Sequence, residues 1–191
     1  MIEVVTNIDF AILDLIQKLH NRVLDFIMES LTLSGNNGYI WIAVCLLLIC
    51  IPKTRKIGLF AAVTLLVEWI LNDWILKEII ARERPFIQNS GIDLIIHQPS
   101  GYSFPSGHSA SSFAVATAIF MHSKKLGIPA YILASLIAFS RLYFYVHFPS
   151  DVIAGILFGT LIAVGMNKLL NFILERVKKH KISEKQSANS D

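Results

Sequence analysis

The sequence predicts an all-α integral membrane protein: a bundle of five to six transmembrane helices with an amphipathic helix at the N-terminus. Three observations predict this class. Of the 191 residues, 54% are hydrophobic and only 16% are charged, against about 25% charged residues in an average soluble domain. The mean hydropathy is +0.57. The net charge of +3, from 17 basic and 14 acidic residues, leaves little field to hold a phosphate backbone, so we expect no nucleic-acid partner.

The first 33 residues predict an amphipathic helix. Apolar residues recur at helical spacing at Ile12, Leu15, Ile16, Leu19, Val23, Phe26 and Ile27, and charged and polar residues occupy the opposite side. A helix with this many charges does not cross lipid, so we expect residues 1–33 to lie in the membrane interface. A helix that packs on the bundle without touching lipid is the alternative. The Gly- and Asn-rich segment 34–38 ends it.

Five later segments are apolar over most of the length that a bilayer requires, about 20 residues. They are residues 39–51, 57–76, 106–122, 126–146 and 152–174. The first is short and must borrow flanking residues. We expect the transmembrane bundle to occupy residues 39–174, and a basic, polar C-terminal tail to follow at 177–191.

The basic residues between these segments predict the orientation. Clusters lie at 52–56 and 124–125 and after residue 175. An alternating arrangement of five spans places all three clusters on the cytoplasmic side, as the positive-inside rule requires. The segments 77–105 and 147–151 then share the extracytoplasmic side of the cell membrane, and the C-terminus is cytoplasmic.

The first outer segment carries two cations, Lys77 and Arg84, at a spacing close to two helical turns. They would share a face if the helix ran that far, although Pro85 disfavours helical backbone at Arg84. Taken alone, a basic cluster that reaches the membrane boundary is the simpler interpretation.

The same outer segment is followed directly by Ser106, Gly107 and His108, which lead into an apolar helix. Free N–H groups at a helix N-terminus form a site for an anion, and Gly107 lets a ligand approach the backbone closely. An ordinary helix start with an incidental histidine is the alternative.

The other outer segment, 147–151, lies between the last two spans. Arg141 precedes it, and His147 is followed four residues later by Asp151. A carboxylate at that spacing can fix an imidazole tautomer, or it can cap the next helix. Taken together, three cations, a helix N-terminus and two histidines on one side of the membrane predict a site for phosphoryl transfer.

The three segments resemble the three-part signature of the type 2 phosphatidic acid phosphatase (PAP2) superfamily. The matching residues are Lys77, Arg84, Pro85, Pro105, Ser106, Gly107, His108, Ser140, Arg141, His147 and Asp151. The resemblance implies a PAP2-like domain at 1–176, His147 as nucleophile, Asp151 as its orienting group, and His108 as acid and then base. It further implies that the phosphate is held by Lys77, Arg84, Ser106, Gly107 and Arg141, without metal or other cofactor.

By analogy with such a family, we expect hydrolysis of a membrane lipid phosphate or diphosphate through a phosphohistidine. Undecaprenyl diphosphate is the first candidate, and phosphatidylglycerol phosphate and phosphatidic acid are alternatives. A haloperoxidase related to the superfamily is disfavoured by the five apolar spans. A non-catalytic membrane interaction protein is disfavoured because no signature residue is missing.

Three charged residues outside the signature need an explanation. Arg82 either contacts a distal phosphate or headgroup or is a solvated boundary charge. Asp73, four residues before Lys77, is expected to pair with it. Glu68 is expected to be a protonated carboxyl in a helix contact, with a functional role as the alternative.

Overall fold

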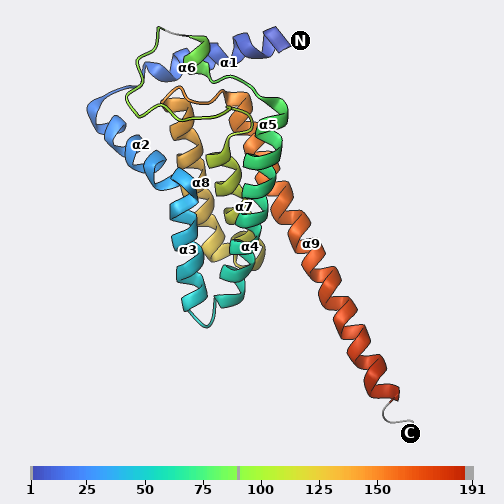
Figure 1. Ribbon diagram of the computed structural model, residues 1–191. Coiled ribbons are helices and arrows are strands. Elements are labelled where there is room, and N and C mark those ends of the chain that lie inside the picture. Colours follow the sequence, from blue (N-terminus) through green and yellow to red (C-terminus); the bar gives the residue numbers. More distant parts are fainter. Residues whose placement is uncertain (1, 90, 188–191) are drawn as a thin grey trace.

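Five of the helices stand side by side as a bundle (Figure 1). The computed structural model describes residues 2–89 and 91–187, and every regular element in these ranges is helical. The bundle helices are α3 (Tyr39–Cys50), α4 (Arg55–Leu71), α7 (Gly107–His122), α8 (Lys124–Tyr143) and α9 (Pro149–Ser187).

Four helical segments are long and apolar enough to cross a membrane: Arg22–Cys50, Arg55–Gln88, Lys124–Tyr143 and Pro149–His180. The remaining helix of the bundle, α7, has 16 residues and lies inside the bundle, where the other helices bury most of its side chains. The chain is therefore a multi-pass membrane protein, and the predicted all-α membrane bundle is confirmed.

Small residues allow α7 and α9 to approach closely. Gly155 and Gly159 lie one turn apart on α9, and a Cβ atom at Gly159 would lie only 2.0 Å from the carbonyl oxygen of Ala110. A Cβ at Gly155 would lie 2.6 Å from the carbonyl oxygen of Ser106. This is the small-residue spacing that brings membrane helices into backbone contact. It fixes the N-terminus of α7 against the first turns of α9.

The single helix predicted over residues 1–33 is wrong, because the chain forms two helices, α1 (Ile2–Gln17) and α2 (Arg22–Gly35). The break comes at Asn21, whose backbone is extended and whose side chain accepts a hydrogen bond from the N–H of Leu24 at 3.0 Å. Asn21 thus caps α2. Helix α2 continues through the kink η1 (Asn36–Gly38) into α3, and this supplies the extra length that segment 39–51 needs to span the membrane.

Asp25, one of the charged residues of α2, is paired with protein groups. Asp25 accepts hydrogen bonds from the Tyr143 hydroxyl and from His20, whose Nδ1 lies 2.7 Å away. A paired carboxylate costs far less to bury than a free one. This pairing lowers the cost of placing Asp25 in the candidate span Arg22–Cys50.

Helix α1 lies across the end of the bundle where α8 ends and α9 begins (Figure 1). Its inner face is buried at Asp9, Leu13 and Ile16. Its outer face carries an exposed apolar row: Val5, Ile8, Ile12 and Leu15. Both faces are therefore apolar in part, with one turned to the bundle and one turned outward.

The helix that carries Lys77 ends earlier than the sequence suggested. The π-helix η2 (Asn72–Leu76) joins α4 to the short α5 (Lys77–Ile80), and Ala81 stops the helix in the left-handed region at a φ of 49°. Arg84 then has extended backbone before α6 (Pro85–Gln88). The condition under which Lys77 and Arg84 would share a helical face is therefore not met, and the loop brings Arg84 to the site instead.

Candidate active site

The three signature segments meet at one cavity of about 780 Å³ near the end of the bundle that α1 covers. Six signature residues line it: Lys77, Arg84, Gly107, His108, Arg141 and His147. Ser106 and Asp151 are buried directly behind this wall. All eight of the site residues predicted from the sequence therefore lie in or beside one cavity.

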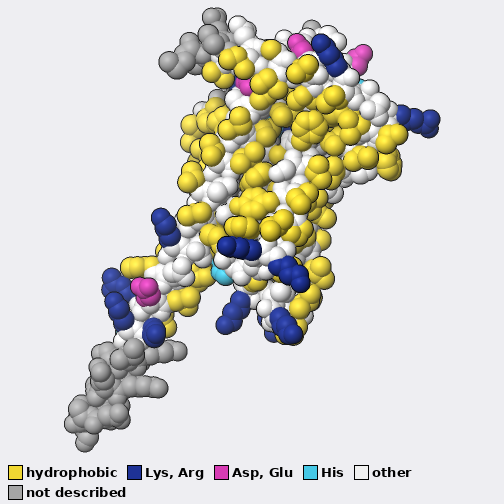
Figure 2. All heavy atoms as spheres, turned by 180° about the vertical axis from the view of Figure 1, so that it is seen from behind, with side chains coloured by type: hydrophobic (Ala, Val, Ile, Leu, Met, Phe, Trp, Pro, Cys, Tyr) yellow, Lys and Arg dark blue, Asp and Glu magenta, His cyan; other side chains and the backbone are white. Residues whose placement is uncertain are grey.

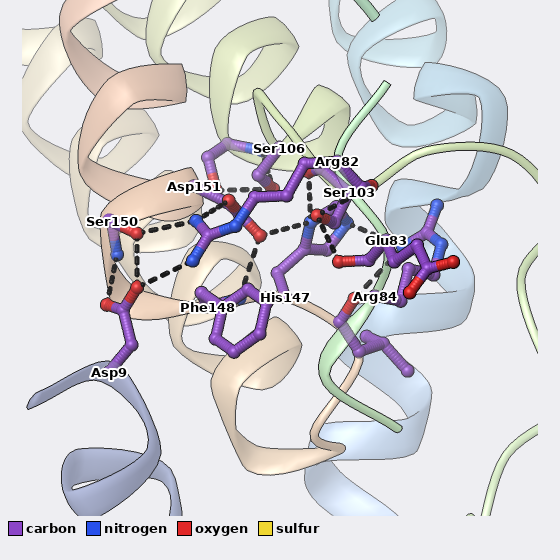
Figure 3. A network of polar contacts seen from close by, with 12 residues as sticks. Asp9, Arg82, Glu83, Arg84, Ser103, Ser106, His147, Phe148, Ser150 and Asp151 are labelled. Carbon is purple, nitrogen blue, oxygen red and sulfur yellow. Dashed lines mark hydrogen bonds and ion pairs between the residues drawn. The ribbon is translucent and has the colours of Figure 1, made fainter. Parts of the chain in front are cut away.

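His147 lies in the short connection between α8 and α9, buried from solvent. Its Nδ1 atom lies 2.7 Å from the carbonyl oxygen of Ser103, and its Nε2 atom lies 3.1 Å from Nη1 of Arg84 (Figure 3). A carbonyl oxygen only accepts and a guanidinium only donates. The proton of the neutral ring is therefore on Nδ1, and the lone pair is on Nε2, where it accepts from Arg84.

Burial is the largest effect on the pKa of His147, and the positive charges of Arg84, Arg141 and Lys77 add to it. Both effects disfavour the imidazolium ion, so the pKa lies well below its ordinary value. A neutral imidazole with its lone pair on Nε2 can act as a nucleophile.

Asp151 lies in the first turn of α9 and makes the contacts of a helix cap. Its Oδ2 atom accepts the backbone N–H of Phe148 at 2.9 Å, as the third residue of a capping box does. The same oxygen lies 3.7 Å from Nδ1 of His147, too far for a hydrogen bond. Asp151 thus neighbours the imidazole as a charge, while Ser103 accepts its proton.

Arg84 is held by three backbone carbonyl groups. Its guanidinium donates to Gly101 at 2.9 Å, to Ser100 at 3.0 Å and to Val146 at 3.0 Å. These bonds fix the guanidinium group of Arg84 in the cavity wall beside His147 and leave the Arg84 side chain little freedom.

Lys77 and Gly107 connect the first and second signature segments. Lys77 is paired with Asp73, which confirms the expected pair. A Cβ atom at Gly107 would lie 3.2 Å from Nζ of Lys77, so the glycine lets the ammonium group approach the N-terminus of α7. A cation and free backbone N–H groups then face the same point of the cavity.

Ser106 caps α7, since its Oγ accepts from the backbone N–H of Ser109 at 3.4 Å and from the Ser109 hydroxyl at 3.0 Å. Its own N–H donates to the carbonyl of Asp151 at 3.1 Å. In the first turn of α7, Nε2 of His108 lies 3.2 Å from the carbonyl of Thr32 and 3.1 Å from Oδ1 of Asn36. Both partners accept, so Nε2 carries a proton and Nδ1 remains for other contacts.

Sequence reasoning missed three residues that hold the site. Thr32 accepts through its hydroxyl from Arg141 and through its carbonyl from His108. Asn36 contacts His108, and Ser103 contacts His147. Two of these contacts use backbone oxygens, which leave no trace in residue identity. Asn36 was visible only as part of a helix break.

Arg82 follows neither of its two predicted roles. It is a partly buried brace that pairs with Asp9 and Asp151 (Figure 3). Glu68 is buried in α4, and neither of its carboxyl oxygens has a hydrogen-bond partner. Among the described residues, no group of three or more His, Cys, Asp and Glu side chains is close enough to hold a metal ion.

The cavity has a second, apolar part between α3 and α4. Its walls there are Ile42, Cys45, Leu46, Ile49, Ala62, Leu65, Leu66 and Trp69. Several of these residues are exposed at the surface of the bundle, so the apolar part forms a groove along the membrane-spanning helices.

Comparison with known proteins identifies relatives of this arrangement. The PAP2 superfamily profile matches residues 56–174. An undecaprenyl-diphosphatase of Sulfolobus acidocaldarius is 36% identical over 126 residues, 65% of this chain and 61% of that protein. Undecaprenyl-diphosphatase BcrC of Bacillus subtilis is 30% identical over 143 residues, 75% of this chain and 73% of that protein.

A solved structure has the same fold. The crystal structure of a transmembrane PAP2-type phosphatidylglycerolphosphate phosphatase from Bacillus subtilis superposes with a TM-score of 0.73 at 27% identity. The match covers 89% of this chain and 88% of that one.

Proposed function

The chain belongs to the PAP2 superfamily, and from this premise we propose that it is a metal-independent lipid phosphatase. It hydrolyses the phosphate or diphosphate group of a membrane lipid through a phosphohistidine at His147. Its preferred substrate is undecaprenyl diphosphate, which it converts to undecaprenyl phosphate and inorganic phosphate.

The cavity is the observation that carries this proposal. Its polar end presents Lys77, Arg84 and Arg141, and three positive charges suit a phosphate group together with the charge that develops during its transfer. Its other end is an apolar groove between α3 and α4. A ligand that fits both ends has an anionic headgroup and a hydrocarbon chain that stays in the membrane.

The first half of the reaction follows from the contacts of His147. The lone pair of Nε2 attacks phosphorus, and Arg84, which now donates to that atom at 3.1 Å, turns its N–H group to a phosphate oxygen. A P–N bond forms as the bond between phosphorus and the leaving oxygen breaks. The leaving oxygen takes a proton from His108.

The second half returns the enzyme to its starting state. His108, now neutral, takes a proton from water as the water oxygen attacks the phosphohistidine. The P–N bond breaks, inorganic phosphate leaves, and His147 recovers its lone pair. The negative charge of bound phosphate stabilises the protonated His108 that the first half needs.

Two considerations support an isoprenoid diphosphate. The relatives from Sulfolobus acidocaldarius and Bacillus subtilis are both named undecaprenyl-diphosphatase. The groove has apolar walls along successive turns of α3 and α4. It therefore offers apolar contacts to a long hydrocarbon chain in addition to the polar contacts of the headgroup. Phosphatidylglycerol phosphate is the second candidate, because the solved relative is named as a phosphatase for it.

Charge supports an extracytoplasmic site in the cell membrane. Lys and Arg side chains gather at the end of the molecule opposite α1 (Figure 2). That end contains the loop between α3 and α4 and the start of α8. The positive-inside rule assigns it to the cytoplasm together with the C-terminal part of α9, so the cavity faces outward.

Phosphate release from purified protein in detergent micelles tests the proposal. The panel is undecaprenyl diphosphate, phosphatidylglycerol phosphate and phosphatidic acid, each with and without EDTA and orthovanadate. We expect the highest kcat/KM for undecaprenyl diphosphate, competition by orthovanadate and little effect of EDTA. No release from any lipid would favour a non-catalytic membrane protein, and strong EDTA inhibition would contradict the metal-independent mechanism.

A further inference from the structure

A chain of three charged side chains links α1 to the start of α9, beside His147 (Figure 3). Arg82 is at its centre. Its Nη2 atom lies 3.0 Å from Oδ2 of Asp9, and its Nη1 atom lies 2.6 Å from Oδ1 of Asp151. The guanidinium also stacks on the ring of Phe148, with its carbon 3.9 Å from the ring centroid.

Both carboxylates in this chain are buried. Asp9 is 3% exposed and Asp151 is fully buried. A carboxylate in such a place is stable as an ion only when it is paired and hydrogen-bonded. Asp9 accepts the N–H of Ser150 at 2.9 Å, which ties α1 to the same helix turn that carries Asp151. Arg82 supplies the positive charge that the two carboxylates share.

We propose that Asp9 and Arg82 are positioning residues that keep Asp151 as a fixed, ionised carboxylate beside His147. The inference rests on the proposed function, in which His147 is the nucleophile. Phosphorylation at Nε2 puts positive charge on the imidazole, and Asp151 lies 3.7 Å from its other nitrogen. An ionised carboxylate at this distance stabilises that charge, whereas a protonated one does not.

The charged and titratable groups around Asp151 come from three parts of the chain. Arg82 and Arg84 belong to the loop after α5, Asp9 belongs to α1, and His147 precedes α9. Arg82 is the one that bonds the Asp151 carboxylate directly. Without it, Asp151 retains its proton to a higher pH, because a buried carboxylate without a partner favours the neutral form.

The alternative is that Arg82 and Asp9 only fasten α1 to the bundle. Helix α1 has a separate anchor, where the Tyr145 hydroxyl donates to Asp14 at 2.9 Å. Asp14→Asn is therefore a matched control that weakens the anchorage of α1 without touching Arg82. Arg176→Ala is the control for loss of an arginine, because Arg176 also stacks on a phenylalanine, Phe172, but lies far along α9.

The experiment measures phosphate release from undecaprenyl diphosphate by the full chain in detergent micelles, over a range of pH. We expect Arg82→Ala to lower kcat about 100-fold and Asp9→Asn at least about tenfold, with KM changed less than about threefold. The acid limb of the rate profile moves to higher pH in Arg82→Ala, because loss of the guanidinium charge favours the protonated form of Asp151. Added guanidinium ions restore part of the Arg82→Ala rate, because the Arg82 side chain is 20% exposed and the space it leaves is accessible. Both controls keep the parent rate and profile.

Three results would overturn the inference. One is Arg82→Ala with the parent rate and pH profile. Another is a folded Arg82→Ala protein that loses activity with an unmoved acid limb and no guanidinium rescue, since that marks a structural brace. The third is an Asp14→Asn loss as large as that of Asp9→Asn. Should Arg82→Ala fail to fold, Arg82→Lys is tested, and a parent-like kcat in it would equally count against the bridging role.

These failures differ from a failure of the proposed function. If only the positioning roles of Asp9 and Arg82 are wrong, the parent protein releases phosphate and only the variants behave unexpectedly. If the proposed function is wrong, the parent protein releases no phosphate from any lipid, and both proposals are refuted together.

Discussion

The Nδ1 atom of His147 lies 2.7 Å from the carbonyl oxygen of Ser103 and 3.7 Å from the carboxylate of Asp151. A backbone group, and not the acidic side chain, therefore accepts the imidazole proton. Ser103 is itself fixed, because its N–H donates to Arg82 at 2.8 Å and its hydroxyl lies 3.1 Å from the carbonyls of Arg82 and Glu83. The loop after α5 and the connection before α9 thus set the tautomer of His147 together.

Replacing His147 with glutamine is expected to abolish phosphate release. Glutamine keeps hydrogen-bonding capacity in the buried position but has no nucleophilic nitrogen, so we expect a loss of at least about 10⁴-fold in kcat. His97→Gln is the matched control, since His97 is exposed and bonds only Gln98 among the contacts in the structure. Activity in His147→Gln within tenfold of the parent would remove the nucleophile assignment.

The pH dependence of kcat/KM is expected to show an acid limb below pH 6.5, the ordinary pKa of histidine. Burial, reinforced by Arg84, Arg141 and Lys77, lowers the pKa of His147, so its neutral, nucleophilic form persists as the pH falls through that value. For kcat, loss of a second proton, from His108, limits the rate on the alkaline side and gives a bell-shaped profile, because the negative charge of bound phosphate keeps His108 protonated in the complex with substrate. An acid limb at or above pH 6.5 would contradict a neutral buried His147.

The same lowered pKa has a consequence for stability. Between the lowered pKa and about 6.5, an unfolded chain binds a proton at His147 and the folded chain does not. Stability therefore falls as the pH decreases through this range. His147→Gln removes this contribution, so its melting temperature is expected to depend less on pH than that of the parent between about pH 5 and 7.

A bulky side chain in the apolar groove is expected to impair lipid substrates selectively. Leu66 lines the groove on α4, and Leu66→Trp is expected to raise KM for undecaprenyl diphosphate about tenfold through steric overlap with the chain. Leu59→Trp, an exposed position on the same helix away from the cavity, serves as control. A water-soluble phosphate monoester has no such chain and should be hydrolysed equally by both. Equal KM values for the lipid would argue against the groove as its binding site.

The sequence predicted the bundle and the convergence of the site because those features depend on residue identity. Apolar runs specify spans, and charged residues near them are rare enough to attract notice, as Lys77 and Arg84 did. The sequence was misleading where a tertiary contact pairs a charged side chain and so allows it to be buried. Asp25 seemed to keep α2 out of the membrane, yet Tyr143 satisfies it. That partner is 118 positions away in sequence, and local periodicity carries no information about it.

The roles of Arg82 and Ser103 were also beyond the sequence. Arg82 is five residues after Lys77 and two before Arg84, a position that predicts either contact with a distal phosphate or headgroup or a solvated boundary charge. Ala81, in the left-handed region with a φ of 49°, ends the helix and the loop sends Arg82 to Asp9 and Asp151 instead. Ser103 acts through its carbonyl group, which every residue has, and only the fold reveals which carbonyl faces the imidazole.

Close packing of α9 on α7 is expected to be necessary for both stability and activity. A Cβ at Gly159 would lie 2.0 Å from the carbonyl oxygen of Ala110, so Gly159→Ala must move backbone and is expected to cost about 1–3 kcal/mol of stability. The shift also displaces the N-terminus of α7, where the Ser106 N–H donates to the Asp151 carbonyl at 3.1 Å, and kcat should fall with it.

Gly165→Ala is the matched control on the same helix, because nothing lies within 4 Å of its added Cβ. There the gain in helix propensity is about 1 kcal/mol. Thermal unfolding in detergent micelles should therefore give a lower melting temperature for Gly159→Ala and an equal or higher one for Gly165→Ala. Equal melting temperatures for the two variants would mean that α7 and α9 do not meet at Gly159 as described.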